Sequence, residues 1–178
     1  WAAPRETFVT NASGTLNLLQ AVTDLGLSPR VVICSSSAVY GSGNGEDPIR
    51  EDHALETADP YGLSKICQEE IGRYFSRVHD LDVVLVRPFF VIGPGKTGDV
   101  CSDFAREIVG IEAGNKEPIS VGNLDVYRDF LDIEDAIEAM LLLSRRGMGG
   151  EAYNICSGHA QSIQSILDML VGHSSKAK

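Results

Sequence analysis

Residue patterns typical of metal-binding, disulfide-rich and membrane proteins are missing from this 178-residue sequence. Its four cysteines are scattered without a Cys-x-x-Cys pair, and its four histidines are equally dispersed. We therefore expect neither a metal site nor a disulfide framework, and the expected location is a reducing cytoplasm. No apolar run approaches the roughly 20 residues that a membrane-spanning helix needs, and no signal peptide is visible.

Positive charge is also scarce, because 15 Lys and Arg residues stand against 25 Asp and Glu residues, for a net charge of −10. Nucleic acids and anionic membranes bind basic surfaces, so neither is an expected partner. With 43% apolar residues, the composition is that of a globular protein with one substantial core. The sequence opens on Trp1 and soon enters a helical pattern, so we expect it to be a piece of a longer protein.

Two short apolar runs, "RVVICSSS" (30–37) and "LDVVLVRP" (81–88), indicate strands that are buried on both faces. Such strands are typical of a parallel sheet covered by helices. Helical patterns over residues 5–26 and 60–78 alternate with them, which predicts an α/β fold. A change of texture near residue 90 suggests a domain boundary. Beyond it we predict a loop-rich segment over residues 89–99. We predict helices over 100–114, 132–145 and 162–172, and short strands over 118–122 and 151–158.

The segment "GPGKTG" (93–98) looks like a phosphate-binding P-loop, but the match fails. That motif needs a glycine five positions before its Gly-Lys pair, and Phe90 stands there. The serines of "CSSSA" are not within a Gly-x-Ser-x-Gly motif either. We therefore expect neither a nucleotide triphosphatase nor a serine hydrolase.

The segment "DPYGLSK" (59–65) begins a helix, because Asp59 is a good N-cap and Pro60 suits the first helical position. Tyr61 and Lys65 are four residues apart and so share a helix face. An ammonium beside a phenol favours the phenolate, which supplies part of the ~4 kcal/mol needed to use tyrosine as a base near pH 7. The alternative is an exposed pair on the helix surface.

Five segments together resemble the extended short-chain dehydrogenase/reductase family, the nucleotide-sugar epimerases, dehydratases and reductases. They are "NASGTLNLLQAV", "SSSAVYG", "DPYGLSK", "VRPFFVIGPG" and "VGNLDVYRDFLDIEDAIEAMLLL". The stretch "VGNLDVYRDF" is most similar to the GDP-mannose branch, with its 4,6-dehydratases and 4-keto-6-deoxy-sugar reductases. The resemblance implies a partial Rossmann-like parallel sheet flanked by helices over residues 1–90, the C-terminal part of an NAD(P)-binding domain. Residues 91–178 would be mainly a smaller α/β substrate domain, with returning Rossmann elements.

The resemblance also implies the roles of individual residues. Ser36 would be the catalytic serine that orients the substrate oxygen, and Tyr61 the acid/base. Lys65 would lower the pKa of Tyr61 and hydrogen-bond the nicotinamide ribose. Besides Tyr61 and Lys65, the residues implied near the cofactor, NAD or NADP, are Asn11, Ser35, Pro88 and Val91. Besides Ser36, those implied near a nucleotide-diphosphate sugar are Phe90, Arg106, Asn123 and Arg128.

Two of these assignments have plain alternatives. Asn11 could be an ordinary amide on a helix face. Arg128, expected at the nucleotide end of the sugar donor, could instead form a structural ion pair with Asp129 or Asp132.

Three departures from the family pattern bear on function. Dehydratases carry a glutamate where this chain has Ala38, which favours a reductase or an epimerase. Phe90 replaces an asparagine that contacts substrate, and the glycine-rich turn that binds pyrophosphate is absent from these residues.

The preferred prediction is a reductase of a GDP-4-keto-6-deoxy-sugar, in a homodimer. The alternatives are a nucleotide-sugar 4-epimerase, a GDP-mannose 4,6-dehydratase, and a non-catalytic interaction module. The 178-residue chain by itself is expected to be inactive.

Overall fold

Three parallel strands form the first sheet of the computed structural model, which describes residues 3–41, 48–115 and 117–176. Their order is β1-β2-β5. The strands are β1 (Val31–Cys34), β2 (Val83–Pro88) and β5 (Ala152–Ile155). Val31 pairs with Val83, and Pro88 with Ile155. The two apolar runs predicted as buried parallel strands are therefore β1 and β2.

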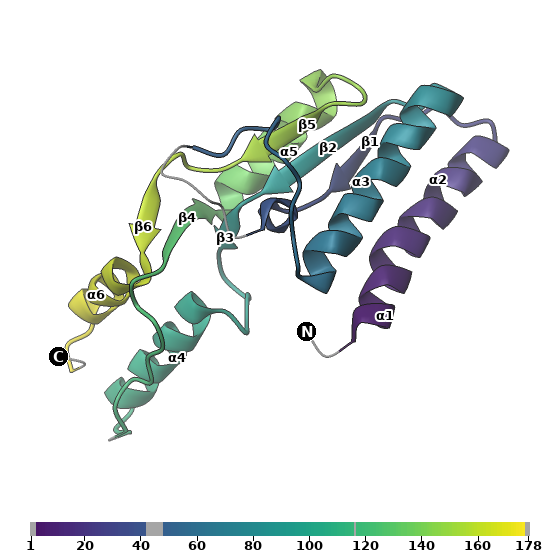
Figure 1. Ribbon diagram of the computed structural model, residues 1–178. Coiled ribbons are helices and arrows are strands. Elements are labelled where there is room, and N and C mark those ends of the chain that lie inside the picture. The colour runs from purple at the N-terminus through teal and green to yellow at the C-terminus, as the bar shows by residue number, and fades with distance from the viewer. Residues whose placement is uncertain (1–2, 42–47, 116, 177–178) are drawn as a thin grey trace. The chain divides into compact units, whose positions relative to one another are not determined.

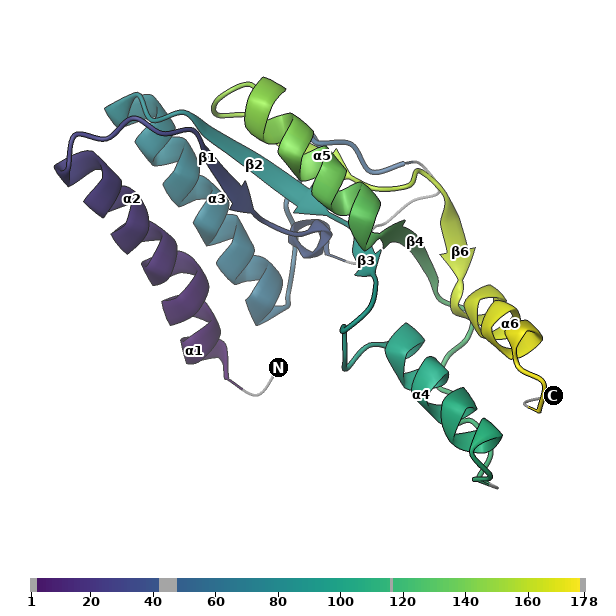
Figure 2. The same cartoon turned by 180° about the vertical axis from the view of Figure 1, so that it is seen from behind.

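Helices cover both faces of this sheet, with α2 and α3 side by side on one face and α5 on the other (Figures 1 and 2). Here the helical elements are α1 (Pro4–Phe8), a π-helix (Val9–Ser13), α2 (Gly14–Asp24), a 3-10 helix (Ser37–Tyr40), α3 (Pro60–His79) and α5 (Ile133–Arg146). This arrangement confirms the predicted α/β fold with a parallel sheet flanked by helices.

The core of the sheet follows from the sequence of β2, whose four consecutive apolar side chains, Val83 to Val86, are 0% exposed. A strand in the middle of a sheet with helices on both faces has no solvent-facing side, so alternation disappears. Leu19 from α2 and Phe75 from α3 pack onto one face together with Ile33 of β1.

Helix α3 begins as its sequence predicts. The carboxylate of Asp59 accepts hydrogen bonds from the backbone N–H groups of Tyr61 and Gly62, both at 3.2 Å, and Pro60 is the first helical residue. These bonds satisfy donors that a helix start otherwise leaves unpaired. The helix ends at His79, and the next residue, Asp80, adopts a left-handed conformation with φ of 53°.

The chain divides into two compact units. The first comprises Trp1–Phe89 and Glu134–Cys156, and the second Phe90–Ile133 and Ser157–Lys178. In the second unit the strand order is β3-β4-β6, with β3 parallel and β6 antiparallel to β4. Its elements are β3 (Phe90–Ile92), α4 (Val100–Glu112), β4 (Tyr127–Asp132), β6 (Ala160–Ser162) and α6 (Ile163–His173).

The second unit has its own core, in which Phe104 of α4 and Phe130 of β4 pack with Ile163, Ile166 and Leu167 of α6. The predicted strand at 118–122 is wrong, because those residues are irregular and the neighbouring strand is β4. Assigning cofactor binding to residues 1–90 and substrate binding to 91–178 stays a prediction, because a structural division assigns no role.

Candidate active site

The carboxyl end of β1 leads directly into Ser36, which has extended backbone angles (φ −164°, ψ 154°) and caps the following 3-10 helix. Its Oγ accepts a hydrogen bond from the Ala38 N–H at 3.2 Å. The Ser36 side chain also forms a hydrogen bond with the Tyr61 phenol at the start of α3. The structure thus brings together two predicted catalytic residues that lie 25 positions apart. Ligands of open α/β sheets bind at this end of the strands.

Lys65 lies one turn beyond Tyr61 and is 9% exposed. Its Nζ donates to the backbone oxygen of Cys34 at 2.7 Å and to Oε1 of Gln68 at 3.0 Å. The same Nζ lies 5.7 Å from the centroid of the Tyr61 ring. An ammonium has three N–H donors, and these two bonds use two of them. The charge of Lys65 is therefore held in place beside the phenol.

Burial is the main influence on both titrating groups. It raises the pKa of Tyr61, an effect that the hydrogen bond from Ser36 opposes and the nearby Cys34 and Asp59 reinforce. Burial likewise lowers the pKa of Lys65. The pKa of Tyr61 is thus raised overall, whereas the family resemblance implied that Lys65 lowers it. Burial therefore favours the protonated phenol, which is the state of a proton donor.

Asn11 lies in the π-helix between α1 and α2, a distortion often found at functional sites. Its Nδ2 donates to Oγ of Ser64 at 2.9 Å, and that hydroxyl donates to the backbone oxygen of Tyr61 at 2.7 Å. Asn11 therefore contacts the first turn of α3.

Ser35 directly follows β1 and Pro88 ends the adjacent strand β2, but the Ser35 side chain points inward. It is 1% exposed, and its hydroxyl donates to Oε1 of Glu69 at 2.5 Å. Any contact of Ser35 with a cofactor would therefore fall to its backbone. Pro88 is the last residue of β2 and is half-buried.

Within the second unit, Phe90 and Val91 form part of β3, opposite Phe130 and Leu131 of β4. The ring of Phe90 meets that of Phe130 edge-on at 5.2 Å between centroids, and Nζ of Lys96 lies 4.0 Å from the Phe90 centroid. An apolar ring with a cation over it thus stands where the family has an asparagine.

The three remaining predicted substrate residues are at the surface of the second unit. Arg106 pairs with Asp103 on α4 at 2.9 Å, and the Asn123 side chain accepts from the backbone N–H of Asp125. Arg128 is exposed, and its Nη1 donates to the Tyr127 backbone oxygen at 2.8 Å.

The carboxylate of Asp129, one of the two ion-pair partners considered for Arg128, is engaged by another segment. It accepts hydrogen bonds from the backbone N–H groups of Ser157 and Gly158 and from the Ser157 hydroxyl.

Sequence reasoning missed a buried ion pair beside Ser35. Glu69 and Arg87 are 0% and 1% exposed, and the guanidinium donates to both carboxylate oxygens at 2.8 and 2.6 Å. Two signals were available. An arginine interrupts the apolar run of β2, and Glu69 continues the spacing of Tyr61 and Lys65 along α3.

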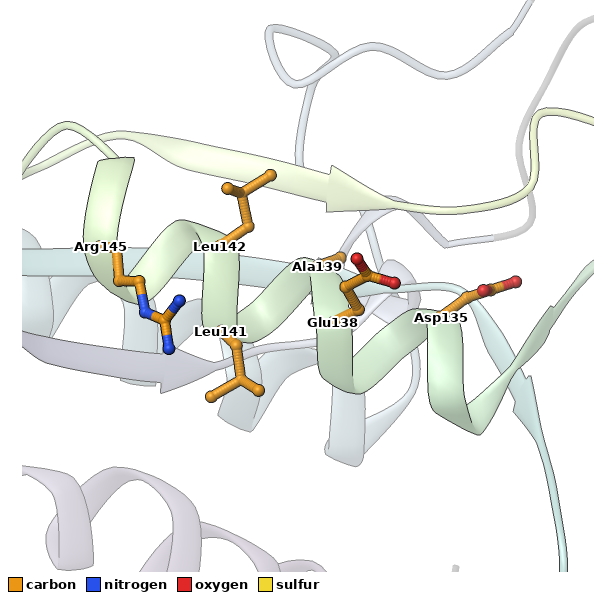
Figure 3. Close-up of a pocket in the computed structure, with 6 residues that line it drawn as sticks. All are labelled: Asp135, Glu138, Ala139, Leu141, Leu142 and Arg145. Atoms are coloured by element: carbon orange, nitrogen blue, oxygen red, sulfur yellow. The ribbon is translucent and has the colours of Figure 1, made fainter.

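A hollow along α5 is a weaker candidate site (Figure 3). Its lining residues are Asp135, Glu138, Ala139, Leu141, Leu142 and Arg145. All six come from one helix, whereas ligand sites gather side chains from several elements. In the described ranges, no group of three His, Cys, Asp or Glu side chains could hold a metal ion. None of the helices in that same part of the chain is long and apolar enough to span a membrane.

Gly62 lets α3 approach the segment that follows Ser36. A Cβ at this position would lie 2.5 Å from the backbone oxygen of Ala38 and 2.6 Å from Oγ1 of Thr57. We expect Gly62→Ala to lower the free energy of unfolding by about 1–3 kcal/mol through this overlap. Urea denaturation measures the change. Gly110→Ala is the matched control, because its Cβ meets no atom closer than 3.8 Å, and an equal loss in both variants would contradict the close approach.

A serine that follows a strand and is joined to a tyrosine whose helix carries a lysine one turn later is the arrangement that the family resemblance implied. The chain matches the NAD dependent epimerase/dehydratase family over residues 1–156 and belongs to that family. This confirms the family predicted from the five segments.

Two of the similar proteins are enzymes named for GDP-6-deoxy sugars. The chain is 37% identical to GDP-6-deoxy-D-mannose reductase of Pseudomonas aeruginosa over 170 residues, which is 94% of this chain and 56% of the relative. It is 29% identical to GDP-6-deoxy-D-talose 4-dehydrogenase of Aggregatibacter actinomycetemcomitans, covering 92% of this chain and 54% of that protein. The chain therefore spans little more than half the length of these relatives.

Solved structures agree with this similarity. RMD from Pseudomonas aeruginosa complexed with NADPH superposes with a TM-score of 0.91 at 36% identity, over 95% of this chain and 59% of that one. MoeE5 in complex with UDP-glucuronic acid and NAD gives 0.80 at 31% identity, over 91% and 53%. Both were solved with a nicotinamide dinucleotide bound.

Proposed function

We propose that the complete protein is an NAD(P)-dependent nucleotide-sugar oxidoreductase that reduces the C4 keto group of a GDP-4-keto-6-deoxy-sugar. The observation that carries the proposal is the hydrogen bond between Ser36 and Tyr61, with the Lys65 ammonium beside it. The 37% identity to a GDP-6-deoxy-D-mannose reductase supports this choice of substrate.

The described residues fit the nicotinamide half of the cofactor, because a buried ammonium with an unspent donor stands at the carboxyl ends of parallel strands. Lys65 would hold the ribose hydroxyls of the cofactor. Asn11, Pro88, Val91 and the backbone of Ser35 would lie near it. When bound, the cofactor supplies the hydride. Whether the cofactor is NAD or NADP depends on the residues that contact the ribose 2′ position at which the two dinucleotides differ.

The side chains of the first unit would handle the proton. Ser36 would hydrogen-bond the C4 oxygen and orient it, and Tyr61 would donate its phenolic proton to that oxygen as the C4 carbonyl is reduced. The charge of Lys65 would then stabilise the phenolate that remains. Because burial favours the protonated phenol, Tyr61 is suited to donate a proton in the direction of reduction.

Ala38 favours a reductase over a dehydratase. It stands two residues after Ser36, in the 3-10 helix, and it has no carboxyl group to donate a proton to a leaving hydroxyl. A 4-epimerase is the second candidate, since a UDP-glucose 4-epimerase of Azospirillum brasilense is 29% identical over 94% of this chain. The same three residues could serve both reactions.

Arg128 is proposed to bind the phosphates of the sugar nucleotide, because its guanidinium is exposed on β4. Arg106 and Asn123 are proposed to assist it, and Phe90 to contact the sugar. We further infer that the protein is a cytoplasmic homodimer and that its net charge of −10 disfavours nucleic acid and membrane surfaces as partners.

The test is an assay of the protein expressed from its complete reading frame. Supplied with GDP-4-keto-6-deoxymannose, it should oxidise NADPH or NADH and form a GDP-6-deoxyhexose. Interconversion of UDP-glucose and UDP-galactose instead would favour the 4-epimerase. A folded protein that binds no dinucleotide and turns over neither substrate would support the interaction module.

Arg128→Ala tests the nucleotide contact. We expect the KM for the sugar nucleotide to rise about 10- to 100-fold, because a hydrogen bond to a charged group contributes roughly 1.5–3 kcal/mol. The KM for the nicotinamide cofactor should not change. Arg145→Ala, an exposed arginine on α5, is the matched control. Equal effects on both KM values would mean that Arg128 has only a structural role.

A further inference from the structure

A buried carboxylate lies on the same stripe of α3 as the proposed catalytic pair. Tyr61, Lys65 and Glu69 are spaced four residues apart, so they line one face of the helix. Oε1 of Glu69 accepts hydrogen bonds from the Ser35 hydroxyl at 2.5 Å and from Nε of Arg87 at 2.8 Å, and Oε2 accepts from Nη2 of Arg87 at 2.6 Å. Glu69 thus joins α3 to Ser35, which directly follows β1, and to Arg87 in β2.

Arg87 extends this connection to the other end of the segment that carries Ser36. Its Nη1 donates to the phenol oxygen of Tyr40 at 2.6 Å, and the Tyr40 hydroxyl donates to Oδ1 of Asn154 at 2.8 Å. Tyr40 is the last residue of the 3-10 helix that Ser36 caps. The Glu69–Arg87 pair therefore holds the chain on both sides of Ser36, at Ser35 and at Tyr40.

We propose that Glu69 and Arg87 are positioning residues that hold Ser36 at hydrogen-bonding distance from Tyr61. This inference rests on the proposed function, in which that bond orients the C4 oxygen. Glu69 and Tyr61 belong to the same rigid helix, so an anchor at Glu69 fixes how far α3 can slide along β1. The bond from Ser35 to Glu69 restrains the adjacent Ser36, and the bond from Arg87 to Tyr40 restrains the end of the 3-10 helix.

A purely structural role predicts a different outcome from a positioning role. If the pair only stabilises the fold, weakening it lowers the free energy of unfolding, while the folded molecules keep their kcat. If the pair positions Ser36, a small displacement lowers kcat, because a misplacement of about 1 Å at a reacting group can cost 10²-fold. The KM values for the sugar nucleotide and the cofactor then stay constant, because they depend on contacts away from Ser36.

The pH profile provides a second readout. Among the described residues, Ser36, Cys34 and Asp59 act on the pKa of Tyr61, and Nζ of Lys65 lies 5.7 Å from the centroid of its ring. Of these, the Ser36 hydrogen bond lowers the pKa of Tyr61. Displacing Ser36 removes that effect, so the pKa rises. Reduction requires the protonated phenol, and its loss of rate at alkaline pH should therefore begin at a higher pH.

Ser35→Ala is the decisive variant, because it removes one anchor and leaves the buried ion pair intact. In the protein from the complete reading frame, we expect kcat to fall about 10- to 100-fold, with KM values for sugar nucleotide and cofactor within about twofold. The alkaline limb should move to higher pH, as in Ser36→Ala. Ser144→Ala is the control, because the half-buried Ser144 lies on α5 and its hydroxyl donates to the Leu141 backbone oxygen. An unchanged kcat, or a raised KM for the cofactor alone, would overturn the proposal.

Hydrogen exchange keeps this test separate from the proposed function. The Ala38 N–H donates to Oγ of Ser36, so its exchange reports how firmly that side chain is held. We expect exchange at Ala38 to be about tenfold faster in Ser35→Ala than in Ser144→Ala. If the parent turns over neither sugar nucleotide, the proposed function fails, while faster exchange still supports the anchor. Equal exchange in the two variants would refute the anchor whatever the activity.

Discussion

Tyr61→Phe, made in the protein from the complete reading frame, should lower turnover by at least about 10²-fold. Proton transfer by a positioned side chain typically contributes this much, and the variant removes only the hydroxyl that bonds to Ser36. The ring remains, so the neighbouring Lys65 keeps its packing, and the affinity for the cofactor should change little. Steady-state kinetics with the sugar nucleotide, beside a direct titration with NADPH, measures both quantities.

Tyr74→Phe is the matched control, because Tyr74 lies on the same helix with 47% of its surface exposed. It should turn over at the parent rate. Near-normal turnover of Tyr61→Phe would remove Tyr61 from the mechanism. A large loss of cofactor affinity in that variant would instead make the phenol a binding group.

Arg87→Met should be the most destabilising of the substitutions considered, with a loss of about 3–5 kcal/mol in the free energy of unfolding. It removes the Arg87 guanidinium, whose Nη2 lies 2.6 Å from Oε2 of the Glu69 carboxylate, and leaves this 0% exposed carboxylate with the more distant Arg73, whose Nη2 lies 3.7 Å away. Burial by itself would lower the pKa of Arg87, but its bonds to Glu69 and Tyr40 outweigh that effect and raise it. Urea denaturation, interpreted with a constant slope, measures the loss.

Two comparison variants sharpen this measurement. Arg106→Met breaks the exposed pair with Asp103 and should cost at most ~1 kcal/mol. The double variant Glu69→Gln/Arg87→Met should recover part of the loss, because no buried charge remains unpaired. A loss for Arg87→Met as small as that for Arg106→Met would show that water reaches the pair.

The sequence predicted the elements whose signals are local. Continuous apolar runs indicated β1 and β2 because both faces of these strands are buried, and Asp59 with Pro60 indicated where α3 begins. It did not predict β4, whose first residues, including Tyr127 and Arg128, are exposed, so that the strand lacks an apolar run. It predicted instead a strand at 118–122, where the isolated apolar residues lie in irregular structure.

For the candidate site, the spacing of Tyr61 and Lys65 was readable because a helix places residues four apart on one face. The resemblance to the family added Ser36. The bond between Ser36 and Tyr61 could not be read from spacing, since 25 residues separate them and only the packing of α3 against the end of β1 brings them together.

The sequence by itself determined that this is an α/β protein of the epimerase/dehydratase family with a Tyr-x-x-x-Lys helix, because these features depend on short-range periodicity and local motifs. Only the tertiary structure decided which partners the buried polar groups take. An arginine inside an apolar strand must be paired, but a choice among many carboxylates depends on distance in space. The packing of α3 on the sheet pairs Arg87 with Glu69, because a buried charge is stable only where a partner's oxygens are within hydrogen-bonding distance. The same carboxylate accepts a hydrogen bond from Ser35, whose side chain therefore points away from the candidate site.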